Sequence, residues 1–211
     1  ARSSWASRDA EGPVSSRSIA GSATSRSVIT ASVTGSVAGA LAGVLAQKGV
    51  DYVDAPVSGG VEGAINGRLV AMVGAELATF ERIQPVITAF SAAVKHMGPV
   101  GSGQATKAVN QVMIAGIAEA VCEALALAEK LNLPSERLLS VVSAGAARSW
   151  FLERRGQTML DSSFDVGFKL SLLLKDLLIC RGLAQDLNIS LPTVEAAIRD
   201  YRELVELGDG D

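Results

Sequence analysis

The chain has 211 residues, of which 48% are hydrophobic and 19% are charged, so it is long enough to bury a core in one or two domains. A formal net charge of −3 gives no electrostatic reason to expect a nucleic-acid partner. One histidine and two distant cysteines exclude a His/Cys metal cluster and argue against a disulfide framework. They favour a reducing setting in the cytoplasm, with the mitochondrial matrix as the alternative.

Residues 1–27 differ from the rest of the chain. They are rich in serine and arginine and have no apolar period. Mitochondrial transit peptides have such a composition, and so do disordered tails, which we favour. We therefore treat 1–27 as a segment outside the folded domains.

Residues 28–99 alternate short apolar runs with helical patterns. Strands are expected over 28–30, 51–56, 69–73 and 93–97, and helices over 36–48 and 77–90. A proline ends the second strand, and Gly49 is expected to terminate the first helix. This alternation predicts an α/β layer architecture.

Residues 100–211 contain no convincing strand. A helix over 103–131 is apolar nearly all round, which predicts a core helix. Its longest apolar stretch is interrupted by Glu119 and Glu123, so we do not expect it to span a membrane. Further helices are expected over 135–144, 168–188 and 192–207. The second half is thus predicted to be an all-α domain, with the boundary within residues 98–103.

The first segment that could carry chemistry is Asp-Ala-Pro-Val-Ser-Gly-Gly at 54–60. Glycines after a strand let backbone N–H groups converge on an anion at the carboxyl edge of a sheet. A tight turn that needs glycine is the simpler interpretation. The spacing alone favours the turn.

The second segment surrounds a lysine. Lys107, Asn110 and Gln111 share one face of the first turns of the long helix. The helix dipole and partial burial would lower the pKa of Lys107 toward the range useful for proton transfer. A lysine that reaches to the surface explains the pattern equally well.

The third segment lies in an apolar helix, which Lys175 and Asp176 interrupt. Buried charges need partners, so an interhelical ion pair is the first interpretation. A contact to a cofactor or substrate is the alternative. We expect the two cysteines to be small core residues and His96 to be structural.

Together the three segments resemble the β-hydroxyacid dehydrogenase family. The resemblance covers residues 28–211 and rests on the motif at 54–60, on Gly-x-Gly-x-x-x-Lys-x-x-Asn-Gln at 101–111, and on Lys-Asp-Leu at 175–177. It implies the C-terminal part of a Rossmann-type domain over 28–99, followed by a helical domain over 100–211. It also implies transfer of a hydride between NAD or NADP and a small β-hydroxy acid.

The resemblance implies specific roles for matched residues. Lys107 matches the lysine that gives a proton to the substrate carbonyl oxygen during reduction. Ser58, Gly59 and Gly60 match the loop that holds the substrate carboxylate, and Asn110 matches an amide that orients the substrate. The physical logic is coherent, because hydride transfer needs a proton source on the oxygen and a fixed acceptor carbon.

Ser32, Phe168 and Lys175 match residues that contact the cofactor. The family's Gly-x-Gly-x-x-Gly loop, which binds a pyrophosphate at a helix N-terminus, does not occur in this sequence. We therefore expect this chain to bind NADH or NADPH weakly or not at all.

Two alternatives remain open. A non-catalytic relative would use the helical domain for dimerisation, and an imine-reducing relative would have another residue in place of the lysine. Retention of Lys107 argues against both. The apolar long helix also predicts a homodimer or homotetramer, because its surface exceeds what the other helices can cover.

Overall fold

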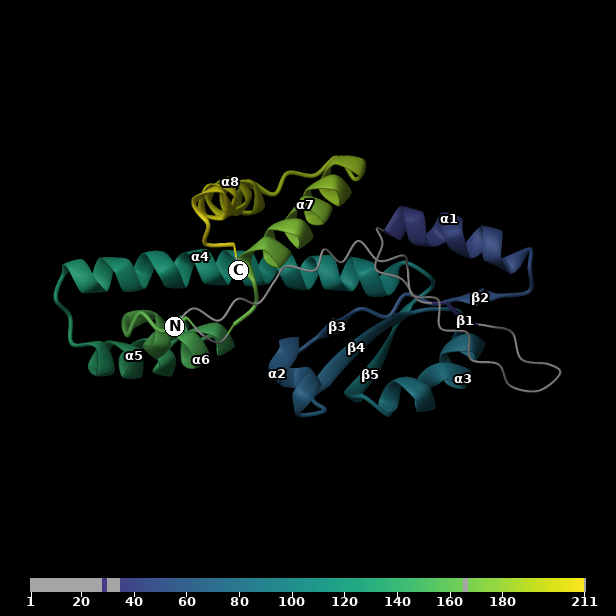
Figure 1. Cartoon of the computed structure of the whole chain (residues 1–211), viewed down its shortest axis with the longest axis horizontal. Helices are drawn as coiled ribbons and strands as arrows, with labels where there is room; N and C mark the ends of the chain where they lie inside the picture. Colours follow the sequence, from purple (N-terminus) through teal and green to yellow (C-terminus); the bar gives the residue numbers. More distant parts are fainter. Residues whose placement is uncertain (1–27, 30–34, 165–166, 211) are drawn as a thin grey trace, which may run out of the picture.

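The computed structural model describes residues 28–29, 35–164 and 167–210. In this part of the chain the strands form two small sheets (Figure 1). The strands are β1 (Val28–Ile29), β2 (Asp51–Tyr52), β3 (Val57–Ser58), β4 (Leu69–Gly74) and β5 (Ser91–Gly98). The helices are α1 (Gly35–Ala46), α2 (Gly60–Ile65), α3 (Leu77–Thr88), α4 (Ser102–Lys130), α5 (Ser135–Ala144), α6 (Trp150–Leu160), α7 (Leu170–Asp186) and α8 (Pro192–Leu207).

Strand β4 is the centre of the larger sheet. It pairs antiparallel with β3 and parallel with β5, whereas β1 and β2 form a separate parallel pair. All but one of its residues are buried, because α3 and α4 both pack against it. A continuous apolar run is typical of such a strand. The core beneath it joins residues of β4 and α3 with two residues of the adjoining loops, namely Val53, Ala71, Val73, Ala75, Ile83 and Ile87.

Helix α4 is the axis of the helical part. Figure 1 shows α7 and α8 on one side of it and α5 and α6 on the other. One core cluster joins α4 to α7 and α8 around Leu177 and Ile198, and a second joins it to α6 around Leu125 and Leu152. By length and composition α4 could cross a membrane, but these helices and the sheet pack against it.

The fold class expected from the sequence is confirmed: a partial Rossmann-type unit is followed by helices arranged around one long core helix. The helices over 135–144 and 192–207 have the bounds that the pattern predicts. The first helix ends earlier than expected, at Ala46, and Gly49 with φ 69° lies in the turn that follows.

The expected strand over 51–56 is wrong in its extent. Strand β2 covers only Asp51–Tyr52. Asp54 then makes an isolated bridge to Gly74, and β3 begins after Pro56 in the other sheet. The chain therefore crosses from one sheet to the other within the motif at 54–60.

Candidate functional site

Lys107 lies near the N-terminal end of α4, at the junction with α7. Its side chain is half-buried, and burial lowers the pKa of its ammonium group, in line with one of the two interpretations that the sequence leaves open. The negative charge of Asp176 raises this pKa and the positive charge of Lys175 lowers it, both by smaller amounts. Because desolvation is the largest of these effects, Lys107 gives up its proton more readily than an exposed lysine does.

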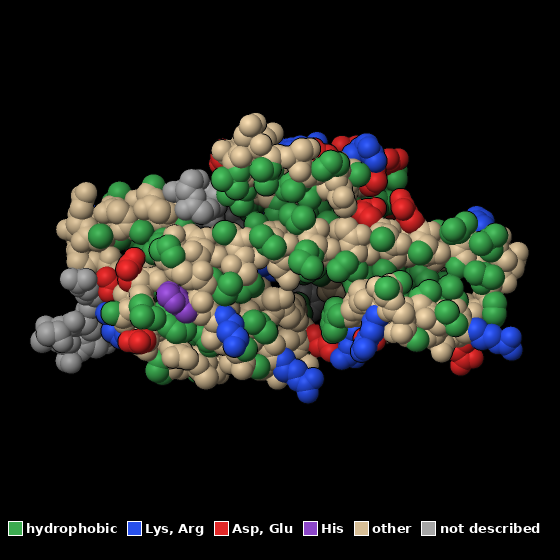
Figure 2. Space-filling model, turned by 180° about the vertical axis from the view of Figure 1, so that it is seen from behind, with side chains coloured by type: hydrophobic (Ala, Val, Ile, Leu, Met, Phe, Trp, Pro, Cys, Tyr) green, Lys and Arg blue, Asp and Glu red, His purple; other side chains and the backbone are tan. Residues whose placement is uncertain are grey.

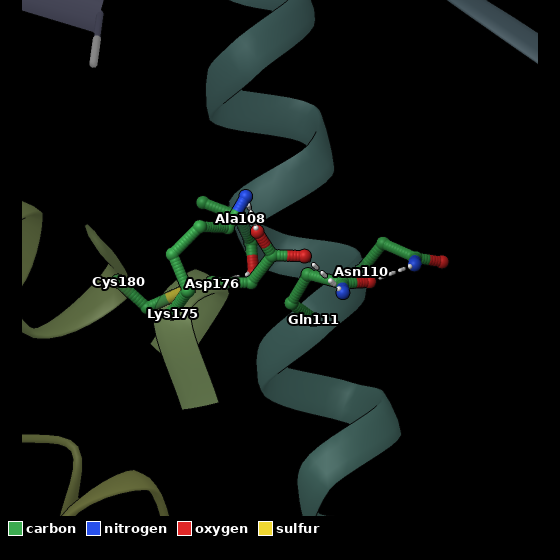
Figure 3. A network of polar contacts seen from close by, with 6 residues as sticks. All are labelled: Ala108, Asn110, Gln111, Lys175, Asp176 and Cys180. Atoms are coloured by element: carbon green, nitrogen blue, oxygen red, sulfur yellow. Dashed lines mark hydrogen bonds and ion pairs between the residues drawn. The ribbon is translucent and has the colours of Figure 1, made fainter. Parts of the chain in front are cut away.

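A chain of polar contacts joins α4 to α7 beside Lys107 (Figure 3). The Asn110 amide donates to Oε1 of Gln111 over 2.9 Å, and Nε2 of Gln111 donates to Oδ2 of Asp176 over 2.7 Å. Nζ of Lys175 lies 2.8 Å from Oδ1 of Asp176. Asp176 thus uses one oxygen toward each helix.

The interhelical ion pair expected for Lys175 is wrong. Lys175 pairs with its neighbour Asp176 on the same helix, and its side chain is 59% exposed. The contact between helices is made instead by Gln111, a neutral side chain that is 2% exposed.

The two cysteines differ from each other. Cys180 is buried on α7, and its thiol donates to the carbonyl oxygen of Ala108 over 3.4 Å, a further tie to α4 (Figure 3). Burial raises the pKa of this thiol to about 11, so it stays protonated at neutral pH. Cys122 is exposed, which corrects the expectation that both cysteines lie in the core.

The motif at 58–60 forms the junction between β3 and α2. Ser58 is half-buried and pairs with Val70 of β4. Gly59 has φ 126° and Gly60 has φ 61°, values that favour glycine over residues with a Cβ atom. Both the turn and the anion-loop interpretations need this backbone, so the conformation fits either one.

The residues assigned to the cofactor by resemblance are placed as follows. Phe168, before α7, is 51% exposed, and Lys175 is also exposed, so both are accessible to a ligand. Ser32 lies outside the described residues. Lys107, Asn110 and Lys175 are gathered at the α4–α7 junction, whereas Ser58, Gly59 and Gly60 belong to β3 and α2.

Sequence reasoning missed the contact between Gln111 and Asp176: it expected an interhelical ion pair at Lys175 and Asp176, and it placed Gln111 only on the helix face of Lys107. Their contact joins positions 65 residues apart, so spacing along one helix could not reveal it. The only signal was that both interrupt apolar helical patterns.

His96 is structural, as expected: Nε2 lies 2.8 Å from the carbonyl oxygen of Ala75, and its ring stacks on Phe80.

Comparison with protein families shows the family to which this chain belongs. Residues 101–211, more than half of the chain, match the family described as NAD-binding of NADP-dependent 3-hydroxyisobutyrate dehydrogenase. The chain belongs to the β-hydroxyacid dehydrogenase family. Residues 26–98 match the NAD binding domain of 6-phosphogluconate dehydrogenase, in keeping with the partial Rossmann-type unit.

Individual proteins are similar to this chain over most of its length. An uncharacterised oxidoreductase of Shewanella frigidimarina is 40% identical over 155 residues, which cover 74% of this chain and 53% of that protein. The 2-hydroxy-3-oxopropionate reductase of Escherichia coli is 40% identical over 144 residues, which cover 68% and 49%. The chain spans about half the length of these curated relatives.

A solved structure shares the arrangement of helices and strands. The 3-hydroxyisobutyrate dehydrogenase of Mycobacterium tuberculosis, solved with L-serine, superposes with a TM-score of 0.79 at 27% identity. The superposition covers 87% of this chain and 67% of that one.

Proposed function

We propose that the protein is an NAD- or NADP-dependent oxidoreductase that interconverts a small β-hydroxy acid and its carbonyl form. The observation that carries this proposal is Lys107: a half-buried lysine whose pKa is lowered by burial, beside a carboxylate held between two helices. A lysine with a lowered pKa suits proton exchange with a carbonyl oxygen near neutral pH. Family membership supports the reaction class.

Lys107 acts as the proton donor when the carbonyl is reduced and as the acceptor when the alcohol is oxidised. Its positive charge also stabilises the negative charge that develops on the carbonyl oxygen. The Asn110 amide has two N–H donors and a carbonyl acceptor, and the contact with Gln111 uses one N–H. The remaining groups orient the substrate on the same face of α4.

The backbone at Ser58, Gly59 and Gly60 holds the substrate carboxylate in this proposal. Two consecutive residues with positive φ support it, because such a backbone can turn its N–H groups toward an anion. A substrate with a carboxylate at one end and a carbonyl two carbons away would be held at both. The family members named 3-hydroxyisobutyrate dehydrogenase and 2-hydroxy-3-oxopropionate reductase make 3-hydroxyisobutyrate and the tartronate semialdehyde/glycerate pair the first substrates to test.

The cofactor contacts assigned to this chain are Ser32, Phe168 and Lys175. The exposed ring of Phe168 and the exposed ammonium of Lys175 fit a ligand that has a flat base and phosphate groups. A bound nicotinamide dinucleotide would supply or accept the hydride. Neither residue distinguishes NADH from NADPH, and weak binding to a chain without the glycine-rich loop stays a prediction.

The non-catalytic and imine-reducing alternatives remain weaker. A scaffold has no need of a lysine whose desolvation costs stability, and an imine reductase would have another residue at that position.

The helical surface of α4 also supports a homodimer or homotetramer. Val109, Met113 and Leu127 lie on one face of this helix, and each is more than 60% exposed.

Substitution of the lysine tests the proposal. In the full product of the gene, Lys107→Met should lower kcat for a β-hydroxy acid by about 10²- to 10⁴-fold, the usual contribution of a positioned acid or base. Lys130→Met, at the exposed far end of the same helix, is the matched control and should leave kcat unchanged. Circular dichroism should show that both variants are folded. Full activity of Lys107→Met would refute the assignment.

A further inference from the structure

Asp54 is a fully buried carboxylate to which the proposed mechanism gives no role. It is 0% exposed. Its backbone is fixed to β4 by two hydrogen bonds, from its N–H to the Gly74 carbonyl over 3.1 Å and from the Gly74 N–H to its own carbonyl over 2.8 Å. The position of Asp54 in the sheet is therefore set before its side chain is considered.

The carboxylate reaches the first turn of α4. Oδ1 accepts from the N–H of Gly101 over 2.6 Å, and Oδ2 accepts from the N–H of Gln104 over 2.8 Å. The first N–H groups of an α-helix are not satisfied by the helix's own carbonyl ladder, and the positive end of the helix dipole favours an anion there. The N-cap residue, Gly101, has no side chain that could do this, so a residue about 50 positions earlier in the chain caps the helix.

Two glycines leave room for this carboxylate. A Cβ atom at Gly103 would meet the carbonyl oxygen of Met72 and would lie 2.8 Å from Oδ2 of Asp54. One at Gly74 would lie 2.8 Å from Cγ of Asp54. Real Cβ atoms essentially never come so close to other heavy atoms. The helix, the strand and the side chain are thus closely packed. A shift of α4 along or across the sheet would break the hydrogen bonds between its first turn and Asp54.

Asp54 connects the two parts of the proposed site, the Ser58–Gly60 loop and Lys107. Four residues after it comes Ser58, at the start of the Ser58–Gly60 loop, and Lys107 lies one turn after Gln104 on α4. The same residue therefore fixes the strand segment that leads to the loop and the helix that carries the lysine. We infer that Asp54 is the positioning residue that sets Lys107 at its working distance from the Ser58–Gly60 loop.

This inference rests on the proposed function and is tested with Asp54→Asn in the full product of the gene. Asparagine has the same shape, but its amide would face one backbone N–H, donor against donor, so α4 should move. A displacement of about 1 Å can cost 10²-fold in rate, and we expect kcat to fall by about that factor. Asp161→Asn, an exposed acid whose side chain contacts Gln157, is the matched control and should keep wild-type kcat.

A second readout does not need turnover. The ε-amine of Lys107, labelled by ¹³C reductive methylation, can be titrated by NMR. In Asp54→Asn the Lys107 signal should titrate closer to an exposed lysine than in the wild type, whereas in Asp161→Asn it should be unchanged. A lower melting temperature with unchanged kcat and an unchanged Lys107 titration would show a purely structural role and overturn the inference.

Gly103→Ala decides the matter if Asp54→Asn does not fold. It keeps the carboxylate, but its Cβ atom would meet the carbonyl oxygens of Met72 and Asp54 as well as Oδ2 of Asp54. Because α4 must then move away from the sheet at Asp54, kcat and the Lys107 titration should change in the same direction. Gly116→Ala, in the same helix with only Thr193 at 3.4 Å, is its control. If Lys107→Met proves fully active, the proposed function fails, and the titration still shows whether Asp54 positions Lys107.

Discussion

At the scale of single residues, burial and, to a smaller extent, the neighbouring charges set the pH at which Lys107 can donate a proton. Burial lowers the pKa of Lys107, and the Asp176 carboxylate opposes this by raising it. Reduction needs the protonated lysine, so its rate should fall as pH rises through this lowered pKa. Oxidation needs the neutral amine and should show the opposite dependence.

Asp176→Asn removes the charge but keeps an oxygen that can accept from Gln111. The pKa of Lys107 should therefore fall further, and the alkaline limb of kcat for reduction should move to lower pH. Asp186→Asn, an exposed acid at the end of the same helix, is the control. Rate profiles from pH 6 to pH 10 would check this, and a limb that stays in place or moves upward would contradict it.

At the scale of elements, the Gln111 side chain fixes the packing of α4 against α7. It is 2% exposed and donates to Asp176. Gln111→Glu would bring two carboxylates together in a buried place. We expect the free energy of unfolding at pH 7 to fall by about 3 kcal/mol, the order of an uncompensated buried charge.

At acid pH the free energy of unfolding should recover in part. Once one of the two carboxyl groups is protonated, the repulsion is lost and that group can donate a hydrogen bond to the other. Urea unfolding of Gln111→Glu at pH 7 and pH 4.5, each relative to wild type at the same pH, would measure it. Gln185→Glu places the same change at an exposed position of α7 and should cost little. An equal loss at both pH values would mean that the effect is one of packing, not of charge.

The helices differ in how well the sequence predicts them. Helix α4 was predictable because its apolar residues extend through 29 residues. Helix α6 was missed, since Gly156 interrupts its pattern; in the fold, a Cβ atom there would lie 2.8 Å from Cδ2 of Leu139 on α5. Helix α2, with six residues, is too short to show a period.

The site was predictable only in part. The lysine, the asparagine and the paired glycines stand out by spacing, and family resemblance supplied their roles. Asp54 and the contact between Gln111 and Asp176 depend on how a sheet edge and two helices meet. No local pattern encodes such a meeting, because its two sides lie about 50 and 65 residues apart in the chain.

At the scale of the whole molecule, many hydrophobic side chains remain exposed on the surface of the single chain. Figure 2 shows hydrophobic side chains exposed along the length of the molecule. On α4, Val109, Met113 and Leu127 are 63%, 62% and 61% exposed and lie on one helical face. An apolar stripe on the longest helix is a surface that a second copy of the chain could bury symmetrically.

We therefore expect sedimentation velocity to show a dimer or tetramer at micromolar concentration. Met113→Glu should shift the population to monomer, because the interface would bury an unpaired charge. Leu187→Glu places the same charge on a residue that is 69% exposed at the end of α7, and it should leave the assembly intact. A wild-type protein that sediments as a monomer, or a Met113→Glu variant that assembles like the wild type, would show that this stripe is not the interface.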